Sequence, residues 1–417
     1  MTIVERLGGL SATGVAKEAT FGTPVTPTSY IPFATDSIEP DPGLFYPELV
    51  SNSRQKNIFA GYGQQKFTGA IEFPLFPTMG TDLLVGAIGL DTQPGYGITI
   101  VNPSATSTTI TAGSIAGATT ITVASVTGIS VGSIIQLDVN ASTTTAEVFE
   151  VSLITGLTLT LDHAALYPHT SGVTVIVGQA SSLYRHSVVP NNTLNSFTIE
   201  RNIGNYQSQQ YAGCRVNKMG LKVPATDAEA SLTCDIIAQS TTSLANPSSP
   251  ITTVNEPIYT FNLLSLNQNT SVGGAAVQIP QANNLEINID NGLVATYTFN
   301  NTHNLEFLTP GALVVNGTFD VIWSSLTDPN FGYFNNLFAA ANNYGTLTAE
   351  LSQGTNLSSM TLTLFNVRWS KLTDEIKLGD VIKSTVSFEA ALNLGEIANA
   401  PATNIELELV NSRYLPY

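Results

Sequence analysis

Tyr211-Ala-Gly-Cys-Arg-Val-Asn-Lys-Met-Gly-Leu-Lys-Val223 is the stretch that decides the fold class of this chain. After the glycine at 213, apolar and polar residues alternate, so that every second side chain lies on the same face. This two-residue period predicts a long β-strand. Residues 230–239 have the same period, and the polar segment 224–229 predicts the turn of a hairpin between them.

The same alternation recurs along the chain and predicts a mainly β protein, with a β-sandwich or partly closed barrel at its centre. Further strands are expected over residues 66–76, 194–200, 284–290, 293–299, 312–323, 346–351, 359–365 and 383–390.

Two short helices are expected to flank this β core. The first places four apolar residues on one face and stops at Gly89; these residues are Leu83, Leu84, Ala87 and Ile88. The second is capped by Asp328, has Pro329 in its first turn and ends at Gly345. The first helix is expected to plug one end of the sandwich.

Changes in composition divide the chain into four parts. Residues 1–50 are rich in proline and predict an extended N-terminal arm. Residues 51–102 and 179–393 form the core. Between them, residues 103–178 consist of short Thr- and Val-rich strands separated by glycines, which predicts a small all-β domain inserted on the outer surface. Residues 394–417 predict a second, C-terminal arm.

Both predicted arms carry large apolar side chains that need a surface to cover them. We expect these side chains to contact neighbouring subunits, and the candidates are Phe21, Tyr30, Ile31, Phe33, Phe45, Tyr46, Tyr414 and Tyr417. A flexible terminus is the simpler alternative, and these residues argue against it.

Charge is scarce in this sequence. Only 11% of the residues are charged, and 31 acidic against 15 basic residues give a net charge of −16. An average soluble protein has about 25% charged residues, so this composition suits a surface largely covered by copies of itself. The acidity argues against ordinary nucleic-acid binding, which depends on Lys and Arg at the phosphates. It is compatible with a wall along which DNA slides.

Residues for catalysis or metal binding are not gathered into a recognisable pattern. No nucleophile elbow, phosphate-binding loop or zinc-protease motif occurs. His163 and His169 lack a third ligand at a suitable spacing. Cys214 and Cys234 lie on neighbouring predicted strands, where a disulfide is conceivable and buried free thiols are favoured. We therefore expect no enzyme activity, no cofactor and no metal.

The order of the predicted pieces resembles the tail tube (major tail) proteins of long-tailed bacteriophages. The segments that carry the resemblance are Lys17-Glu-Ala-Thr-Phe-Gly-Thr-Pro24, Ala87-Ile-Gly-Leu90, Leu183-Tyr-Arg-His-Ser187, Ser196-Phe-Thr-Ile-Glu200 and Tyr211-Ala-Gly-Cys-Arg-Val-Asn217. The resemblance covers most of the chain outside 103–178. That module is similar to the small β-domains that phage tail proteins carry as insertions.

This resemblance implies a structural virion protein whose subunits form hexameric rings, stacked head to tail into a tube. Hairpins from the six subunits would close a barrel around a channel for double-stranded DNA. The implied partners are further copies of the chain and the tape-measure, tail-tip and tail-terminator proteins. The large insertion favours a sheathless, siphovirus-type tail. The implied location is the virion tail, reached from the host cytoplasm, since neither a signal peptide nor a membrane span is expected.

In the family that this chain resembles, the channel surface is acidic. Acidic residues on or beside the candidate hairpins are Glu200, Asp227, Glu229, Asp235, Glu286 and Asp290. Ordinary solvent exposure on a strand explains each of them equally well, so both interpretations stay open.

A second hypothesis is a β-sandwich on the surface of a virion or cell that binds carbohydrate. Aromatic side chains stacked on one sheet face would favour it. Trp323 and Trp369 are expected in the strand core instead, so the structural hypothesis is preferred.

Overall fold

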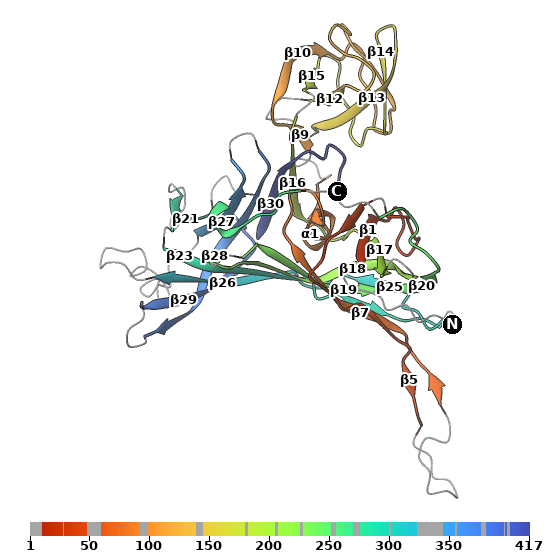
Figure 1. Cartoon of the computed structure of the whole chain (residues 1–417). Coiled ribbons are helices and arrows are strands. Elements are labelled where there is room, and N and C mark those ends of the chain that lie inside the picture. Colours follow the sequence, from red (N-terminus) through yellow and green to blue (C-terminus); the bar gives the residue numbers. More distant parts are fainter. Residues whose placement is uncertain are drawn as a thin grey trace, which may run out of the picture.

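The computed structural model describes residues 11–27, 29–47, 60–91, 98–138, 145–179, 182–204, 207–225, 228–251, 256–269, 276–279, 281–299, 302–322, 345–354, 357–376, 381–395, 397 and 401–417. Figure 1 shows a wide main body of β-strands, a smaller β unit above it and a hairpin that projects below it. The main body is a sandwich of two layers, which confirms the expected mainly β fold, and its described strands do not close into a barrel.

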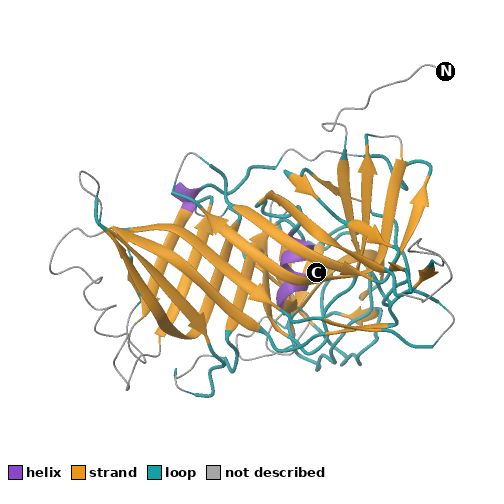
Figure 2. Cartoon of the chain, turned by 90° about the horizontal axis from the view of Figure 1, so that it is seen from below, coloured by secondary structure: helices purple, strands orange, loops and turns teal. Residues whose placement is uncertain are grey.

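One layer of the sandwich, which we call the main sheet, is antiparallel and lies at the bottom of the body in Figure 1. Its strands in spatial order are β7 (Lys66–Pro74), β19 (Ser231–Ala238), β18 (Gln207–Val223), β23 (Ala282–Asp290), β26 (Val314–Ile322) and β29 (Lys383–Ala390). Figure 2, seen from below, shows strands spread side by side in a broad sheet. The predicted 211–239 hairpin is confirmed, with Lys222 opposite Ser231.

The second layer contains two groups of strands. The first group is β2 (Ser29–Ile31), β1 (Ala12–Lys17), β17 (Phe197–Ile203) and β20 (Ser240–Leu244), together with the first half of β18. The second group is β8 (Gly89–Leu90), β9 (Ile98–Ile100), β16 (Tyr184–Pro190), β30 (Ile405–Asn411), β28 (Ser359–Glu375), β27 (Gly345–Ser352), β21 (Leu264–Asn269) and β22 (Val277–Gln278).

Short elements complete the body and its projection. They are β3 (Thr35–Asp36), β4 (Glu39–Asp41), β5 (Leu44–Phe45), β6 (Gly61–Tyr62), β24 (Val294–Thr296), β25 (Phe307–Thr309) and a 3₁₀ turn at Phe261–Leu263. β3 and β4 pair with β7, and β5 pairs with β6 beyond them, so this hairpin continues the edge of the main sheet outward.

Two long strands join the layers, because each one changes partners part-way along its length. The first half of β18 pairs with β17 and β20, and the second half pairs with β19 and β23. The change follows Gly213, whose φ is +66°. In β28 the change falls at Asn366, with φ +48°, after which the strand pairs with β29. Such left-handed residues bend a strand and turn it out of its ladder.

The hydrophobic core fills the space between the layers, and α1 (Thr81–Ile88) lies within it. The predicted face is confirmed, since its four apolar residues are all buried. Val85 is buried as well, so the helix is covered on all sides. Gly86 allows this fit, because a Cβ there would come within 2.4 Å of the Phe197 ring.

Residues 103–178 contain a separate antiparallel sheet, which we call the six-stranded unit. Its strands in spatial order are β10 (Pro103–Thr109), β15 (Thr174–Gly178), β12 (Ile134–Leu137), β13 (Glu147–Thr155), β14 (Thr158–Leu161) and β11 (Thr120–Thr122). The unit has its own hydrophobic cluster, centred on Ile135, Phe149 and Leu159. In Figure 1 it stands above the body, on the side away from the main sheet.

The terminal regions differ from the extended arms expected from their prolines. Residues 12–17 form β1, which pairs with β17 and β2 of the same subunit. Residues 405–411 form β30, which lies between β16 and β28. The alternating sequence Ile405-Glu-Leu-Glu-Leu409 is the signal for this strand. The second predicted helix, 328–345, begins outside the described residues, and Gly345 is the first residue of β27.

The bend at Gly213 provides a test of the sandwich. We expect Gly213→Ala to lower the free energy of unfolding by more than about 3 kcal/mol, because the left-handed φ disfavours a side chain and the new Cβ would lie 2.6 Å from the Cβ of Gln239. Gly156→Ala is the control, since Gly156 has φ +61° with nothing within 4 Å. It should cost about 1–2 kcal/mol. Denaturant unfolding of the subunit measures both, and equal costs would contradict the proposed crowding at the bend.

Candidate functional face of the main sheet

The main sheet has one face in the core and one face away from it, because side chains alternate along each strand. On the face away from the core, which we call the polar face, carboxylates come from β7, β19, β23, β26 and β29. They are Glu72, Asp235, Glu286, Asp290, Asp320 and Glu389. β18 contributes Lys218 and Lys222 at the centre. Acidic side chains therefore surround a short lysine row.

Strand register sets which of these charges meet. Lys218 lies opposite Asp235 on β19 and opposite Asp290 on β23, and Lys222 lies opposite Glu286. The Lys218 Nζ atom is 3.0 Å from Asp290 Oδ2. A shallow groove passes over this place, and its polar lining includes Lys218, Lys222, Asp235, Glu286 and Asp290. The structure thus brings together three of the six acidic candidates.

The Lys218–Asp290 pair shifts both groups toward their charged forms. Its hydrogen bond and the nearby negative charge raise the pKa of Lys218. Burial alone would raise the pKa of the Asp290 carboxyl, but the Gly292 N–H, the Lys218 hydrogen bond and the lysine charge together lower it. Both side chains are well exposed, so the pair fixes local charge and contributes little to stability.

The other acidic candidates lie elsewhere. Glu200 is completely buried; its carboxylate accepts a 2.9 Å hydrogen bond from the Ser248 N–H and further bonds from the Ser248 and Tyr30 hydroxyls. It anchors a loop inside the subunit. Glu229 is exposed and its backbone bridges to Thr260. Asp227 lies outside the described residues.

Most of the large apolar candidates from the predicted arms are packed within their own subunit. Tyr30, Ile31 and Tyr417 are buried. Phe33 packs against the core, Phe21 lies 4.9 Å below the Arg215 guanidinium, and Tyr414 packs edge-on against Tyr184.

Phe45 and Tyr46 are the exposed members of this set. Phe45 is 52% exposed and lies on the projecting β5–β6 hairpin, where Leu44 and Tyr62 are exposed too. The hairpin therefore presents four large apolar side chains to solvent, an arrangement typical of a surface that another molecule covers.

Sequence reasoning missed the carboxylates of the buried Glu18 and the half-buried Glu256, which hold backbone amides. Glu18 accepts 2.9 Å hydrogen bonds from the N–H groups of Gly22 and Gly213, so it binds the amide that turns out of the ladder at the β18 bend. Glu256 accepts the N–H groups of Thr78 and Met79 before α1. Single acidic residues in turns carry no periodic signal, so only the structure reveals their partners.

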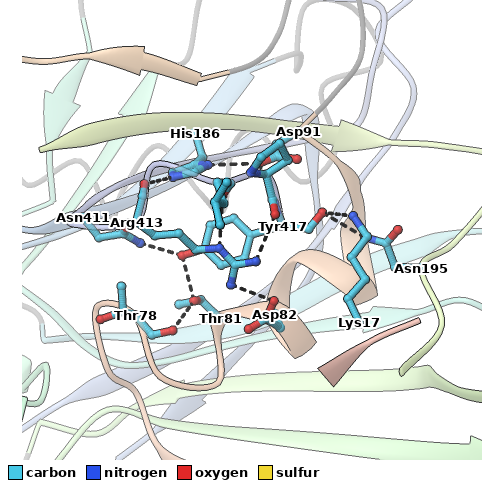
Figure 3. Close-up of polar contacts among 12 residues, drawn as sticks. Lys17, Thr78, Thr81, Asp82, Asp91, His186, Asn195, Asn411, Arg413 and Tyr417 are labelled. Carbon is cyan, nitrogen blue, oxygen red and sulfur yellow. Dashed lines mark hydrogen bonds and ion pairs between the residues drawn. The ribbon is translucent and has the colours of Figure 1, made fainter. Parts of the chain in front are cut away.

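A buried polar network, shown in Figure 3, joins α1 to the last residues of the chain. His186 lies 3.0 Å from Asp91, Arg413 forms a 2.9 Å ion pair with Asp82, and Tyr417 packs edge-on against His186. The segment around His186 contributes to the family resemblance, but its sequence does not indicate this role.

The thiols and remaining histidines have structural surroundings. Cys214 and Cys234 are free and buried, which agrees with the favoured interpretation, and burial raises the pKa of both thiols. His169 lies 2.8 Å from Glu147, and His163 lies 2.9 Å from Asp162. The described residues contain no cluster of three or more His, Cys, Asp or Glu side chains able to hold a metal. Trp369 packs against the core near Phe319, and Trp323 lies outside the described residues.

Comparison with known families decides the identity of this fold. A model of the phage tail tube protein family matches residues 8–390, which include the main sheet and the six-stranded unit. The chain belongs to the phage tail tube protein family. No curated protein matches it.

This tail tube protein is therefore a structural component of the virion tail, which self-assembles into a tube together with other tail components. Its family is structural and not enzymatic. In the part of the chain that the structure describes, no helix is long and apolar enough to cross a membrane.

The two kinds of acidic residue can be separated by mutation. We expect Glu200→Gln to reduce the free energy of unfolding by about 2 kcal/mol, because the amide cannot accept the same set of charge-assisted hydrogen bonds. Asp235→Asn, on the polar face, should change it by less than about 0.5 kcal/mol. Urea unfolding of both variants measures these free energies. If the free energy of unfolding of Glu200→Gln equals that of the native chain, Glu200 does not anchor the loop.

Proposed function

We propose that this tail tube protein forms hexameric rings, stacked head to tail, around a channel lined by the polar face. Viral double-stranded DNA passes through this channel into the host. The observation that carries the proposal is the polar face itself, where six carboxylates on five strands outnumber four lysines: Lys218 and Lys222 at the centre, and Lys66 and Lys383 on the outer strands β7 and β29. Channel-facing roles for Asp235, Glu286 and Asp290 follow from it, and we extend the same proposal to Glu229 and Asp227.

The charge pattern suits a surface over which DNA moves. Lysines that bind phosphates release counterions and hold DNA strongly. Here Lys218 is engaged by Asp290 and faces Asp235, and Lys222 faces Glu286. Because its six carboxylates outnumber its four lysines, the face repels phosphates weakly, so that DNA is neither held nor trapped.

The projecting hairpin supports assembly from many copies. Its exposed Leu44, Phe45, Tyr46 and Tyr62 need a cover, and in a polymer the next subunit supplies it. A contact between a hairpin and a different surface is heterologous: it closes into a ring when the rotation permits and otherwise extends into a filament. A tube of stacked rings needs both kinds of contact: one that closes each ring, and one that extends the stack from ring to ring.

The six-stranded unit lies on the side of the body away from the main sheet, so a channel along the polar face directs the unit outward. Its two ends are close together, since Asn102 accepts hydrogen bonds from Ser182 and Leu183. This geometry is expected of an insertion, residues 103–178, on the outer wall. A projecting unit would crowd a sheath, and we therefore favour a sheathless siphovirus-type tail.

Assembly requires partners that start, measure and end the tube. We propose that subunits remain in the host cytoplasm until a tail-tip complex and a tape-measure protein present a matching edge, and that a terminator protein caps the finished tube. Negative-stain microscopy of the purified subunit, alone and with tail-tip complexes, should show hollow tubes or six-fold rings. A clean monomer under both conditions would contradict the proposal.

Cysteine labelling tests which face lines the channel. We expect Asn288→Cys, on the polar face, to react in assembled tubes with a small maleimide but not with a maleimide carried by streptavidin. Leu166→Cys, on the exposed surface of the six-stranded unit, should react with both reagents. The native cysteines are buried and provide little background.

The free subunit is the control for this experiment, because both positions should then react with both reagents. Full labelling of Asn288→Cys by the streptavidin reagent in tubes would place the polar face outside and would overturn the proposed channel.

The hairpin provides a second test. We expect the double variant Phe45→Ala with Tyr62→Ala to fold with an unchanged unfolding midpoint and to lose tube formation, because both side chains are exposed in the subunit and anchor aromatics dominate interface energy. Leu153→Ala with Leu166→Ala, two exposed leucines of the six-stranded unit, is the matched control and should assemble normally. Tubes from the hairpin variant would exclude this contact.

A further inference from the structure

The last residues of the chain, Arg413–Tyr417, form a strap that contacts both the body and the six-stranded unit. Tyr414 lies at the joint between them. Its ring packs edge-on against Tyr184 of β16 at 6.1 Å, and its hydroxyl donates a 3.0 Å hydrogen bond to Glu150 of β13. Burial and this bond raise the pKa of Tyr414 to about 12. The same joint contains a small hydrophobic cluster of Ile98, Ile100, Val148 and Tyr184.

Tyr417 anchors the other end of the strap in the body. It is only 1% exposed, and its hydroxyl accepts hydrogen bonds from Thr81 at 2.9 Å and Asn411 at 2.7 Å. Its backbone N–H donates to Asp91 Oδ2 at 3.0 Å, and its carbonyl oxygen accepts from Lys17. The Arg413 guanidinium lies 4.1 Å above the Tyr417 ring. Figure 3 shows these contacts converging beside the start of α1.

His186 holds the strap through both of its ring nitrogens. Nδ1 lies 3.0 Å from Asp91 Oδ2, and Nε2 lies 2.7 Å from the Arg413 carbonyl oxygen. A carbonyl oxygen only accepts, so Nε2 carries a proton and donates it to the strap. Asp91 Oδ2 also accepts the Tyr417 N–H, so one carboxyl oxygen contacts both the His186 ring and the end of the strap. The side chains of His186 and Asp91 are completely buried.

Charged groups from the neighbouring elements surround the His186–Asp91 contact. Asp91 follows β8 and Asp82 lies on α1, whereas Lys17 of β1 and Arg413 of the strap are positive. Burial lowers the pKa of Lys17, against the opposing influence of Asp91 and Asp82. Replacing His186 removes the Nε2–H donor to the Arg413 carbonyl oxygen, so the strap loses one of its bonds.

We propose that the strap is a latch that fixes the orientation of the six-stranded unit on the body, and that the hydrogen bond from His186 Nε2 to the Arg413 carbonyl oxygen holds it closed. The strap and β30 lie outside the family match, which ends at residue 390. The latch is thus a feature of this chain's own C-terminal segment. It needs no contact with another subunit, so it operates before and after assembly.

Trypsin provides a direct test on the full-length protein. The Arg413–Tyr414 bond can be cut only when the strap opens, because the guanidinium is held by Asp82 and by the Leu415 and Pro416 carbonyls. Intact mass then reports the loss of residues 414–417. We expect His186→Gln to be cut on the order of tenfold faster than the native chain, since removing the buried imidazole that donates to the strap favours local opening.

A matched variant distinguishes the His186 contact from a general loosening of β16. Arg185→Gln, on the exposed face of the same strand, is the control and should be cut at the native rate. Equal cleavage of native and His186→Gln chains would overturn the proposal.

Two further measurements keep the test decisive if His186→Gln does not fold. Imidazole ¹⁵N NMR of the native protein should show the His186 Nε2 nitrogen protonated, as its bond to the Arg413 carbonyl oxygen requires, and an unprotonated Nε2 would overturn the latch. Spin labels at Leu166→Cys and Asn288→Cys should give a narrow distance distribution that broadens in Tyr414→Ala. An unchanged distribution would show that the strap does not set the orientation of the unit.

Discussion

The bend in β18 is the constraint on which the rest of the fold depends. A single strand of 17 residues serves both layers, and it can do so only because Gly213 adopts a left-handed conformation that turns the chain out of one ladder and into another. The turned amide is satisfied by the buried Glu18 carboxylate. Beyond the bend, the pairing of β18 with β19 and β23 sets the register of the main sheet, and that register determines which charges share the polar face.

Acidic residues serve two opposite purposes in this protein. Inside the subunit, Glu18, Glu200 and Glu256 accept backbone N–H groups and fix loops that no regular ladder reaches. On the polar face, Asp235, Glu286 and Asp290 lie beside the lysines, and Asp290 also accepts the N–H of Gly292 just beyond its strand. Burial sets the main distinction, because a buried carboxylate must be compensated by donors, whereas an exposed one is also solvated by water.

Periodicity made the fold predictable, and the absence of periodicity explains what was missed. The 211–239 hairpin, the strands of the main sheet and the apolar face of α1 all follow from alternation or helical spacing. Prolines led to the expectation of two arms, although the alternating residues 405–409 encode β30. Glu200 lies on a predicted strand as Asp235 does, and only tertiary packing separates a loop anchor from a face residue. Asp91 and His186 contact each other although they are 95 positions apart in the sequence, and no local pattern indicates this pairing.

The strap shows how a fold with little charge can still depend on charge at one place. Where charged side chains are few, each buried pair interacts with fewer competitors and with less water. His186, Asp91, Arg413 and Asp82 concentrate such interactions beside α1. The main sheet relies instead chiefly on apolar packing and ladder hydrogen bonds. Loss of the strap contacts can therefore act on the orientation of the six-stranded unit and leave the main sheet intact.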